Sequence, residues 1–163
     1  MTELQGAVAL AQLDRVEEVV RDRQCTATQF LSESADIPGV AAQVVPPTAQ
    51  SVFWKVTLRL DPAQTGADVR EVGAYLKSEF GVVCAPRYVQ KPAFECEIFR
   101  EKRTFGASQW PLRHVKSPDP AHFEGTYDAL AHMLVLPWNE NYGAEHVRYV
   151  VDSLRASVAH FQA

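Results

Sequence analysis

The sequence contains little of what marks secreted, membrane or nucleic-acid-binding proteins. It has only three cysteines, Cys25, Cys84 and Cys96, and no C-x-x-C pair, which favours reduced intracellular thiols over a disulfide framework. Its apolar runs are far shorter than the roughly 18 residues that span a bilayer. Its N-terminus carries acids in place of a signal peptide's basic flank. With a net charge of −4 and no block of lysine or arginine, it also lacks a phosphate-tracking surface. We therefore expect a cytoplasmic protein without a membrane or nucleic-acid partner.

The common catalytic and cofactor motifs are missing too. There is no G-x-S-x-G, G-x-x-x-x-G-K-[ST] or G-x-G-x-x-G sequence, and the glycines are scattered singly, so no Gly-rich turn can present backbone amides to a phosphate. The five histidines form no H-x-x-x-H pair and have no cysteine at metal-ligand spacing. We predict no catalytic residue, no metal site and no cofactor bound by this chain alone.

What the sequence does contain is typical of one globular domain over residues 1–163. Hydrophobic residues make up 47% and charged residues 22%, close to the averages of folded proteins. Good helix formers follow Thr2 and no proline occurs before Pro38, so a long N-terminal helix is expected. The segment Ile37–Gln50, "IPGVAAQVVPPTAQ", is predicted to be a linker within the domain.

Three segments are predicted to be short strands. Residues 51–60, "SVFWKVTLRL", alternate between apolar and polar positions, as a half-buried strand does. The segments "VVCAP" at 82–86 and "MLVLP" at 133–137 are continuous apolar runs ended by proline. On the first strand, the buried face is expected to consist of Val52, Trp54, Val56, Leu58 and Leu60.

Helical periods separate these strands. One helix is expected over residues 65–81, with Thr65 and Asp68 as a capping pair and Gly81 as its stop. Another follows Asp119-Pro120, and the last follows an Asn141 cap. The apolar stripe of the last helix is Val147, Val150, Val151, Leu154, Val158 and Phe161. The predicted fold is an α/β two-layer sandwich, a short and mostly antiparallel sheet packed by helices, with a long N-terminal helix.

Two stretches are candidates for binding. Residues 87–118 show no sustained period, and at their start Arg87, Tyr88, Lys91 and Phe94 place two cations among aromatic rings just beyond a strand end. Such a rim could hold an anionic or hydroxylated ligand, or it could be ordinary loop packing. The segment Leu4–Ala11, "LQGAVALA", is apolar nearly all round, which is typical of a helix covered on more than one side or of a locally Ala-rich helix that needs no partner.

Three segments resemble a known family, the DegT/DnrJ/EryC1/StrS aminotransferases. The opening "MTELQGAVALAQLDRVEEVVRDR" is similar to the family's "M-x-E-L-x-A-A-x-G-L-x-Q-L" helix, and "PRYVQKPAFECEIF" is similar to its "H-Y-x-P" segment. The segment "VLPWNENYGAEHVRYVVDSL" is similar to its "L-P" and "V-x-x-V" ending. The resemblance spans the whole chain but covers only the C-terminal portion of the family.

The resemblance implies the small domain of a fold-type I pyridoxal-phosphate enzyme that acts on sugars or cyclitols, some of them in antibiotic biosynthesis. The Schiff-base lysine and the phosphate-binding residues would lie in a large domain preceding Met1, so pyridoxal phosphate belongs to the complete enzyme, typically a dimer. The large domain, or self-association, would cover the first helix at Leu4, Val8, Leu10 and Ala11. Arg87-Tyr88 replaces the frequent His-Tyr, which implies a phosphorylated or more polar substrate.

Three hypotheses of function follow. The chain is a fragment or split subunit of such an aminotransferase and shapes the substrate pocket. Alternatively, it is a stand-alone, non-catalytic binding or regulatory protein derived from such a domain. Its distinguishing feature would be a polar or self-associated surface at Leu4–Ala11, and a homodimer through the first helix would favour it. The third hypothesis is an independent enzyme built on Arg87, Tyr88 and a histidine, for which the sequence shows no base and nucleophile pairing.

Overall fold

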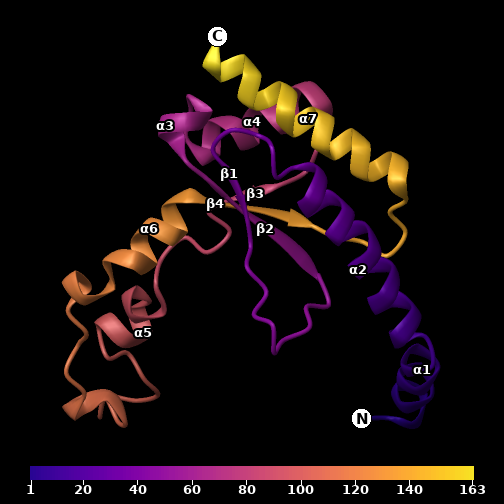
Figure 1. The fold of residues 1–163 in the computed structure, drawn as a ribbon. Coiled ribbons are helices and arrows are strands. Elements are labelled where there is room, and N and C mark those ends of the chain that lie inside the picture. The colour runs from indigo at the N-terminus through magenta and orange to yellow at the C-terminus, as the bar shows by residue number, and fades with distance from the viewer.

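A four-stranded antiparallel sheet lies at the centre of the computed structural model, which describes residues 1–163 (Figure 1). The spatial order is β1-β2-β4-β3, and β4 therefore lies between two strands that precede it in the chain. Thr57 of β2 and Ala85 of β3 both lie opposite Val135 of β4. The strands are β1 (Val40–Ala42), β2 (Lys55–Leu60), β3 (Ala85–Pro86) and β4 (Met133–Pro137).

The helices surround this sheet unequally. Helices α2, α4 and α7 cover one face, while α5 and α6 lie towards the other face (Figure 1). The helices are α1 (Glu3–Leu13), α2 (Val16–Glu33), α3 (Pro62–Thr65), α4 (Val69–Phe80), α5 (Glu97–Arg100), α6 (Glu124–His132) and α7 (Ala144–Gln162). Single 3-10 turns lie at Ala93–Glu95, Leu112–His114 and Pro120–Phe123. The predicted α/β sandwich with an antiparallel sheet is confirmed.

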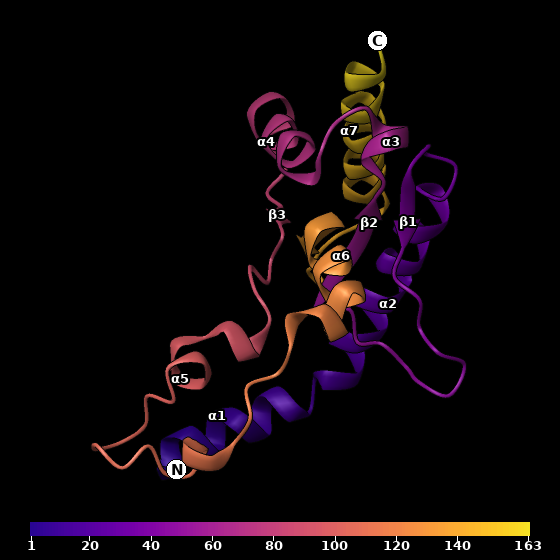
Figure 2. The ribbon, with the colours of Figure 1, turned by 90° about the vertical axis from the view of Figure 1, so that its left-hand side faces the viewer.

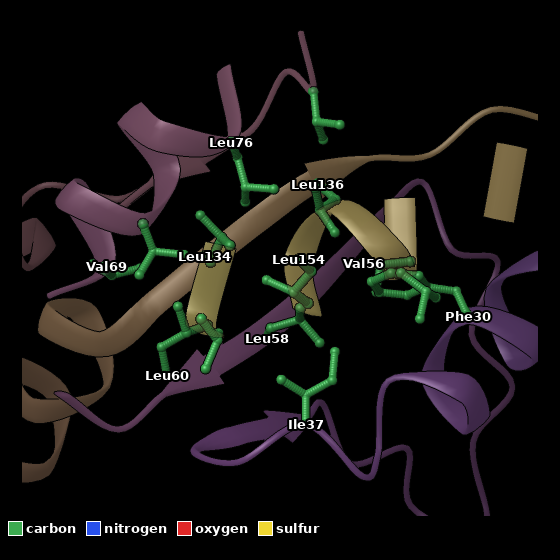
Figure 3. Close-up of a cluster of buried hydrophobic side chains, with 14 of the residues drawn as sticks. Phe30, Ile37, Val56, Leu58, Leu60, Val69, Leu76, Leu134, Leu136 and Leu154 are labelled. Atoms are coloured by element: carbon green, nitrogen blue, oxygen red, sulfur yellow. The ribbon is translucent and has the colours of Figure 1, made fainter. Parts of the chain in front are cut away.

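The core lies between the helix-covered face of the sheet and α2, α4 and α7 (Figure 3). Alternate residues of β2 and β4 enter it, because successive side chains of a strand point to opposite faces. The predicted stripe of α7 is confirmed, with Val147, Val151, Leu154 and Val158 buried. The largest buried side chains of the cluster are Phe30, Val56, Leu58, Leu60, Leu76, Leu134 and Leu154.

Two parts of the chain project beyond the sheet. Residues 87–118, called the arm below, contain α5 and extend away from β3, and α1 extends to the same side of the sheet, apart from the arm in Figure 1 (Figures 1 and 2). The predicted long N-terminal helix is interrupted by a turn at Asp14 and Arg15, so that it forms α1 and α2. Thr2 and Gln5 cap the start of α1 reciprocally. None of the helices is both long and apolar enough to cross a membrane.

Three predictions about the sheet need correction. The alternation of the first strand fails at its start, because Phe53 has a left-handed backbone (φ 44°) that breaks the two-residue period. Phe53 is therefore buried and Trp54 is 64% exposed, with Val52 half exposed as well. The segment Ile37–Gln50 is not only a linker, since Val40–Ala42 pairs with β2 as β1. The run at 82–86 forms regular pairing only at Ala85 and Pro86, as β3.

Two predicted caps are also wrong. The cap of α4 is Asp68 together with Glu71, and Thr65 ends the preceding α3 with a buried hydroxyl that donates to the Asp61 and Ala67 carbonyls. Asn141 lies in a turn that Asn139 closes, so α7 starts only after Gly143. At α4 the Asp68 side chain accepts from the amides of Arg70 and Glu71, whereas α7 starts after Gly143 without a side-chain hydrogen bond from its N-cap residue. Gly81 does end α4 in the left-handed conformation, as predicted.

Candidate functional site

The sheet face opposite the core carries a lysine between two aromatic rings. Lys55 precedes the buried Val56 on β2, so its side chain points to that opposite face. Its Nζ donates to the Tyr88 hydroxyl at 2.8 Å and lies 3.2 Å from the centroid of the Trp54 ring. Both rings are largely exposed. The cluster Trp54, Lys55 and Tyr88 can therefore offer a cation, a hydroxyl and apolar ring surfaces to one ligand.

Arg87 lies next to this cluster in sequence but points elsewhere. Its backbone is left-handed (φ 50°) and its amide donates to the Met133 carbonyl at 2.8 Å, which continues the pairing of β3 with β4. Its side chain lines a cavity of about 230 Å³ together with Asp68, Arg70 and His132. Its Nε is buried and has no hydrogen-bond partner. This N–H can donate to a carboxylate or phosphate oxygen.

Lys91 and Phe94 lie further along the arm, away from the Lys55 cluster and from the cavity at Arg87. Phe94 packs against Phe123, with ring centroids 4.8 Å apart, and Lys91 shares with it a cavity of about 380 Å³. Glu95 in this cavity accepts a hydrogen bond from the Tyr127 hydroxyl, and that bond raises the pKa of Tyr127. The structure thus brings Lys91 and Phe94 together, while Tyr88 and Arg87 each have other neighbours.

Sequence reasoning missed Trp54 and Lys55. The pattern predicts Lys55 to be a solvated strand residue and Trp54 to belong to the core face. The left-handed backbone of Phe53 leaves no signal in a pattern of hydrophobic alternation. The adjacent tryptophan and lysine at the start of a strand were the only local cue. The contact with Tyr88 required the pairing of both β2 and β3 with β4.

The helix starts of this chain do not fit the phosphate of pyridoxal phosphate. That cofactor needs a lysine amine for its Schiff base, a partner for its pyridine nitrogen and a cradle of backbone amides for its phosphate. Each of the five helices of nine residues or more has a carboxylate in its first turn, and a carboxylate there repels a phosphate. No three histidine, cysteine or carboxylate side chains lie close enough together to hold a metal ion.

Solved structures with a similar fold include several aminotransferases. The aminotransferase TlmJ from Streptoalloteichus hindustanus is 22% identical with a TM-score of 0.67, and the alignment covers 94% of this chain and 35% of TlmJ. DesV of S. venezuelae, solved with a ketimine intermediate, is 18% identical with a TM-score of 0.75, and the alignment covers 97% of this chain and 37% of DesV. PseC of Helicobacter pylori, an aminotransferase of pseudoaminic acid biosynthesis, is 15% identical with a TM-score of 0.74, and the alignment covers 98% of this chain and 38% of PseC.

The chain thus spans little more than a third of the length of these enzymes. A search among curated proteins returns no match. The family model of the DegT/DnrJ/EryC1/StrS aminotransferases matches residues 1–155, nearly the whole chain. Together with the antiparallel sheet and its helical cover, this match identifies the chain as a member of the DegT/DnrJ/EryC1/StrS aminotransferase family.

Proposed function

We propose that this chain is the small domain of a pyridoxal-phosphate-dependent sugar or cyclitol aminotransferase. In this proposal it shapes the substrate pocket and needs a lysine-bearing large-domain part for catalysis. The family match and the coverage of about a third of each solved enzyme support it. Pyridoxal phosphate, which the family implies for the complete enzyme, supplies the electron sink for amino transfer when bound. A dimeric, cytoplasmic complete enzyme, acting in antibiotic biosynthesis, is part of the same proposal and rests on the resemblance alone.

The exposed apolar surface of α1 carries this proposal. Although α1 is rich in apolar residues, it buries none of them, and Leu4, Val8 and Leu10 are 75%, 55% and 66% exposed. Large apolar side chains exposed together in this way mark an interaction site. Leu4, Val8, Leu10 and the exposed Ala11 are therefore proposed as the interface with the large-domain part.

The face bearing Lys55 is proposed to line the substrate pocket. It lies on the side of the sheet without the helical core, towards which the arm and α1 both project (Figure 1). The Lys55 ammonium can donate to a sugar hydroxyl, and the rings of Trp54 and Tyr88 can pack against the apolar face of a sugar ring. Arg87, with its unpartnered Nε, can bind a phosphate or carboxylate of the substrate.

Reconstitution tests the proposal. The chain is mixed with the purified large domain of a family aminotransferase, and association, Schiff-base absorption and amino transfer to a keto sugar are measured. We expect association at micromolar concentration and activity only in the mixture. Val8→Glu should abolish both because it places a charge in the apolar interface, whereas Val44→Glu, at an exposed valine outside α1, should not.

Two outcomes would contradict the proposal. One is the absence of association between wild-type chain and large domain up to about 100 µM, an affinity too weak for an interface of standard size. The other is a stable homodimer through α1 that Val8→Glu dissociates and that the large domain does not displace. That result would favour the stand-alone binding protein. Size-exclusion chromatography with light scattering distinguishes the two complexes.

A further inference from the structure

The arm differs in charge from the rest of the chain. Residues 87–118 contain seven lysines and arginines against three acids, a net charge of +4. The other residues contain nine basic against seventeen acidic side chains, a net charge of −8. A basic segment on an acidic domain concentrates anions locally, since exposed charges act over roughly 8–10 Å at physiological salt.

The arm also forms a half-open apolar cavity of about 310 Å³. Its walls come from the start of the arm, Phe94 and Phe99, and from the region of the Leu112–His114 turn, Leu112 and Val115. This volume is at the lower end of the range of small-molecule sites. An apolar hollow of this kind favours the burial of an aromatic or branched aliphatic group.

Two lysines are the only charged residues of this cavity. Lys102 and Lys116 line it, no carboxylate does, and none of the seven ion pairs of the structure involves a lysine. The Lys102 Nζ donates to the Arg113 carbonyl at 3.3 Å, which holds the ammonium in place. The Lys102 backbone is left-handed (φ 52°), a conformation that is uncommon for residues with side chains and recurs at binding sites.

We propose that the arm cavity binds a small amphipathic anion. The aromatic or branched body of the ligand lies against Phe94, Phe99 and Val115, and its carboxylate or phosphate lies beside Lys102 and Lys116. A free sugar does not fit this description, because its hydroxyls would find almost only apolar walls. The inference goes beyond the proposed aminotransferase role and does not depend on it, because every residue of the site lies in the arm of this chain.

Titration of the whole chain with four probes tests the site. Phenyl phosphate and benzoate carry both an apolar ring and an anion, whereas benzyl alcohol has the ring without a charge and inorganic phosphate has the charge without a ring. We expect phenyl phosphate or benzoate to bind at least about tenfold more tightly than benzyl alcohol or inorganic phosphate, by calorimetry or by chemical-shift changes in the arm. Comparison of phenyl phosphate with benzoate shows which oxyanion is preferred.

Matched variants separate the site from general charge attraction. Lys102→Gln and Lys116→Gln should each weaken binding of the anionic probe about fivefold or more and leave benzyl alcohol unchanged. Lys77→Gln, which removes the same charge on α4, should have no effect. Phe99→Ala should weaken the anion and the alcohol together, and circular dichroism checks that it folds.

The proposal is overturned if the double variant Lys102→Gln/Lys116→Gln binds phenyl phosphate and benzoate as wild type does, or if no probe binds at 10 mM. It is also overturned if Lys77→Gln reduces affinity as much as the arm variants, since the attraction would then be one of net charge. Because these experiments use the isolated chain, their failure would leave the reconstitution with a large domain unaffected, and the reverse also holds.

Discussion

A buried hydrogen bond joins the end of β4 to α2 and leads to a quantitative prediction. The Trp138 Nε1 donates to the Thr26 Oγ1 at 3.0 Å, and the Thr26 hydroxyl donates in turn to the Asp22 carbonyl at 3.1 Å. Both side chains are buried, and the indole ring packs against Phe30 of α2, with centroids 5.1 Å apart. Because α2 continues from α1, this bond helps to set the direction in which the apolar surface of α1 projects.

Thr26→Val replaces the hydroxyl with a methyl group of similar size, so the main loss is the acceptor of the Trp138 indole N–H. A buried donor left without a partner costs about 1–3 kcal/mol. For a domain of this size, each kcal/mol shifts Tm by about 2–4 °C. We therefore expect Thr26→Val to lower the free energy of unfolding by about 1–3 kcal/mol and Tm by about 2–12 °C.

A double-mutant cycle isolates the hydrogen bond. Trp138→Phe removes the donor but leaves the Thr26 hydroxyl bonded to the Asp22 carbonyl, so adding Thr26→Val to Trp138→Phe should cost much less than adding it to wild type. We expect a coupling energy of about 0.5–3 kcal/mol from urea denaturation followed by circular dichroism. Thr26→Ser, which keeps the hydroxyl, should retain most of this coupling. A coupling near zero would refute the inference that this bond fixes α2 to the sheet.

Two further predictions concern a helix glycine and a cysteine. Gly73→Ala should destabilise the protein by about 1–3 kcal/mol in urea denaturation, because the added methyl group would overlap Pro86 Cγ. Gly6→Ala, which has no atom within 4 Å of its Cβ, should instead stabilise α1 by up to about 1 kcal/mol. If both substitutions stabilise the protein, α4 and β3 are not in close contact. Burial raises the pKa of the Cys84 thiol to about 11. Since an unfolded thiol titrates near about 8.5, stability should be fully present below that pH and fall as pH rises through 11. Cys84→Ala should remove this decline while Cys25→Ala, at an exposed cysteine, should not, and an unchanged decline in Cys84→Ala would exclude the thiol as its cause.

Much of the fold followed from local patterns. A period of 3.6 residues predicts the apolar stripe of α7, and an apolar run predicts the strand at Met133–Pro137. A glycine predicts the end of α4 at Gly81. All three signals involve residues that are close in sequence. The candidate site was predictable only in part. Arg87, Tyr88, Lys91 and Phe94 are close in sequence, but the structure places them in three separate surroundings.

By itself, the sequence determined the class of fold, the elements of the core, the family and the excess of apolar residues on α1. These depend on composition, period and motif, which are properties of short segments. The tertiary structure alone decided that Phe53 turns inward and Trp54 outward, that Val40–Ala42 joins the sheet and that Lys55 meets Tyr88. It also brought Lys102 and Lys116 to one apolar cavity. Each of these depends on contacts between residues far apart in the chain, and a backbone turn or a strand pairing that creates such a contact leaves no periodic signal in the residues themselves.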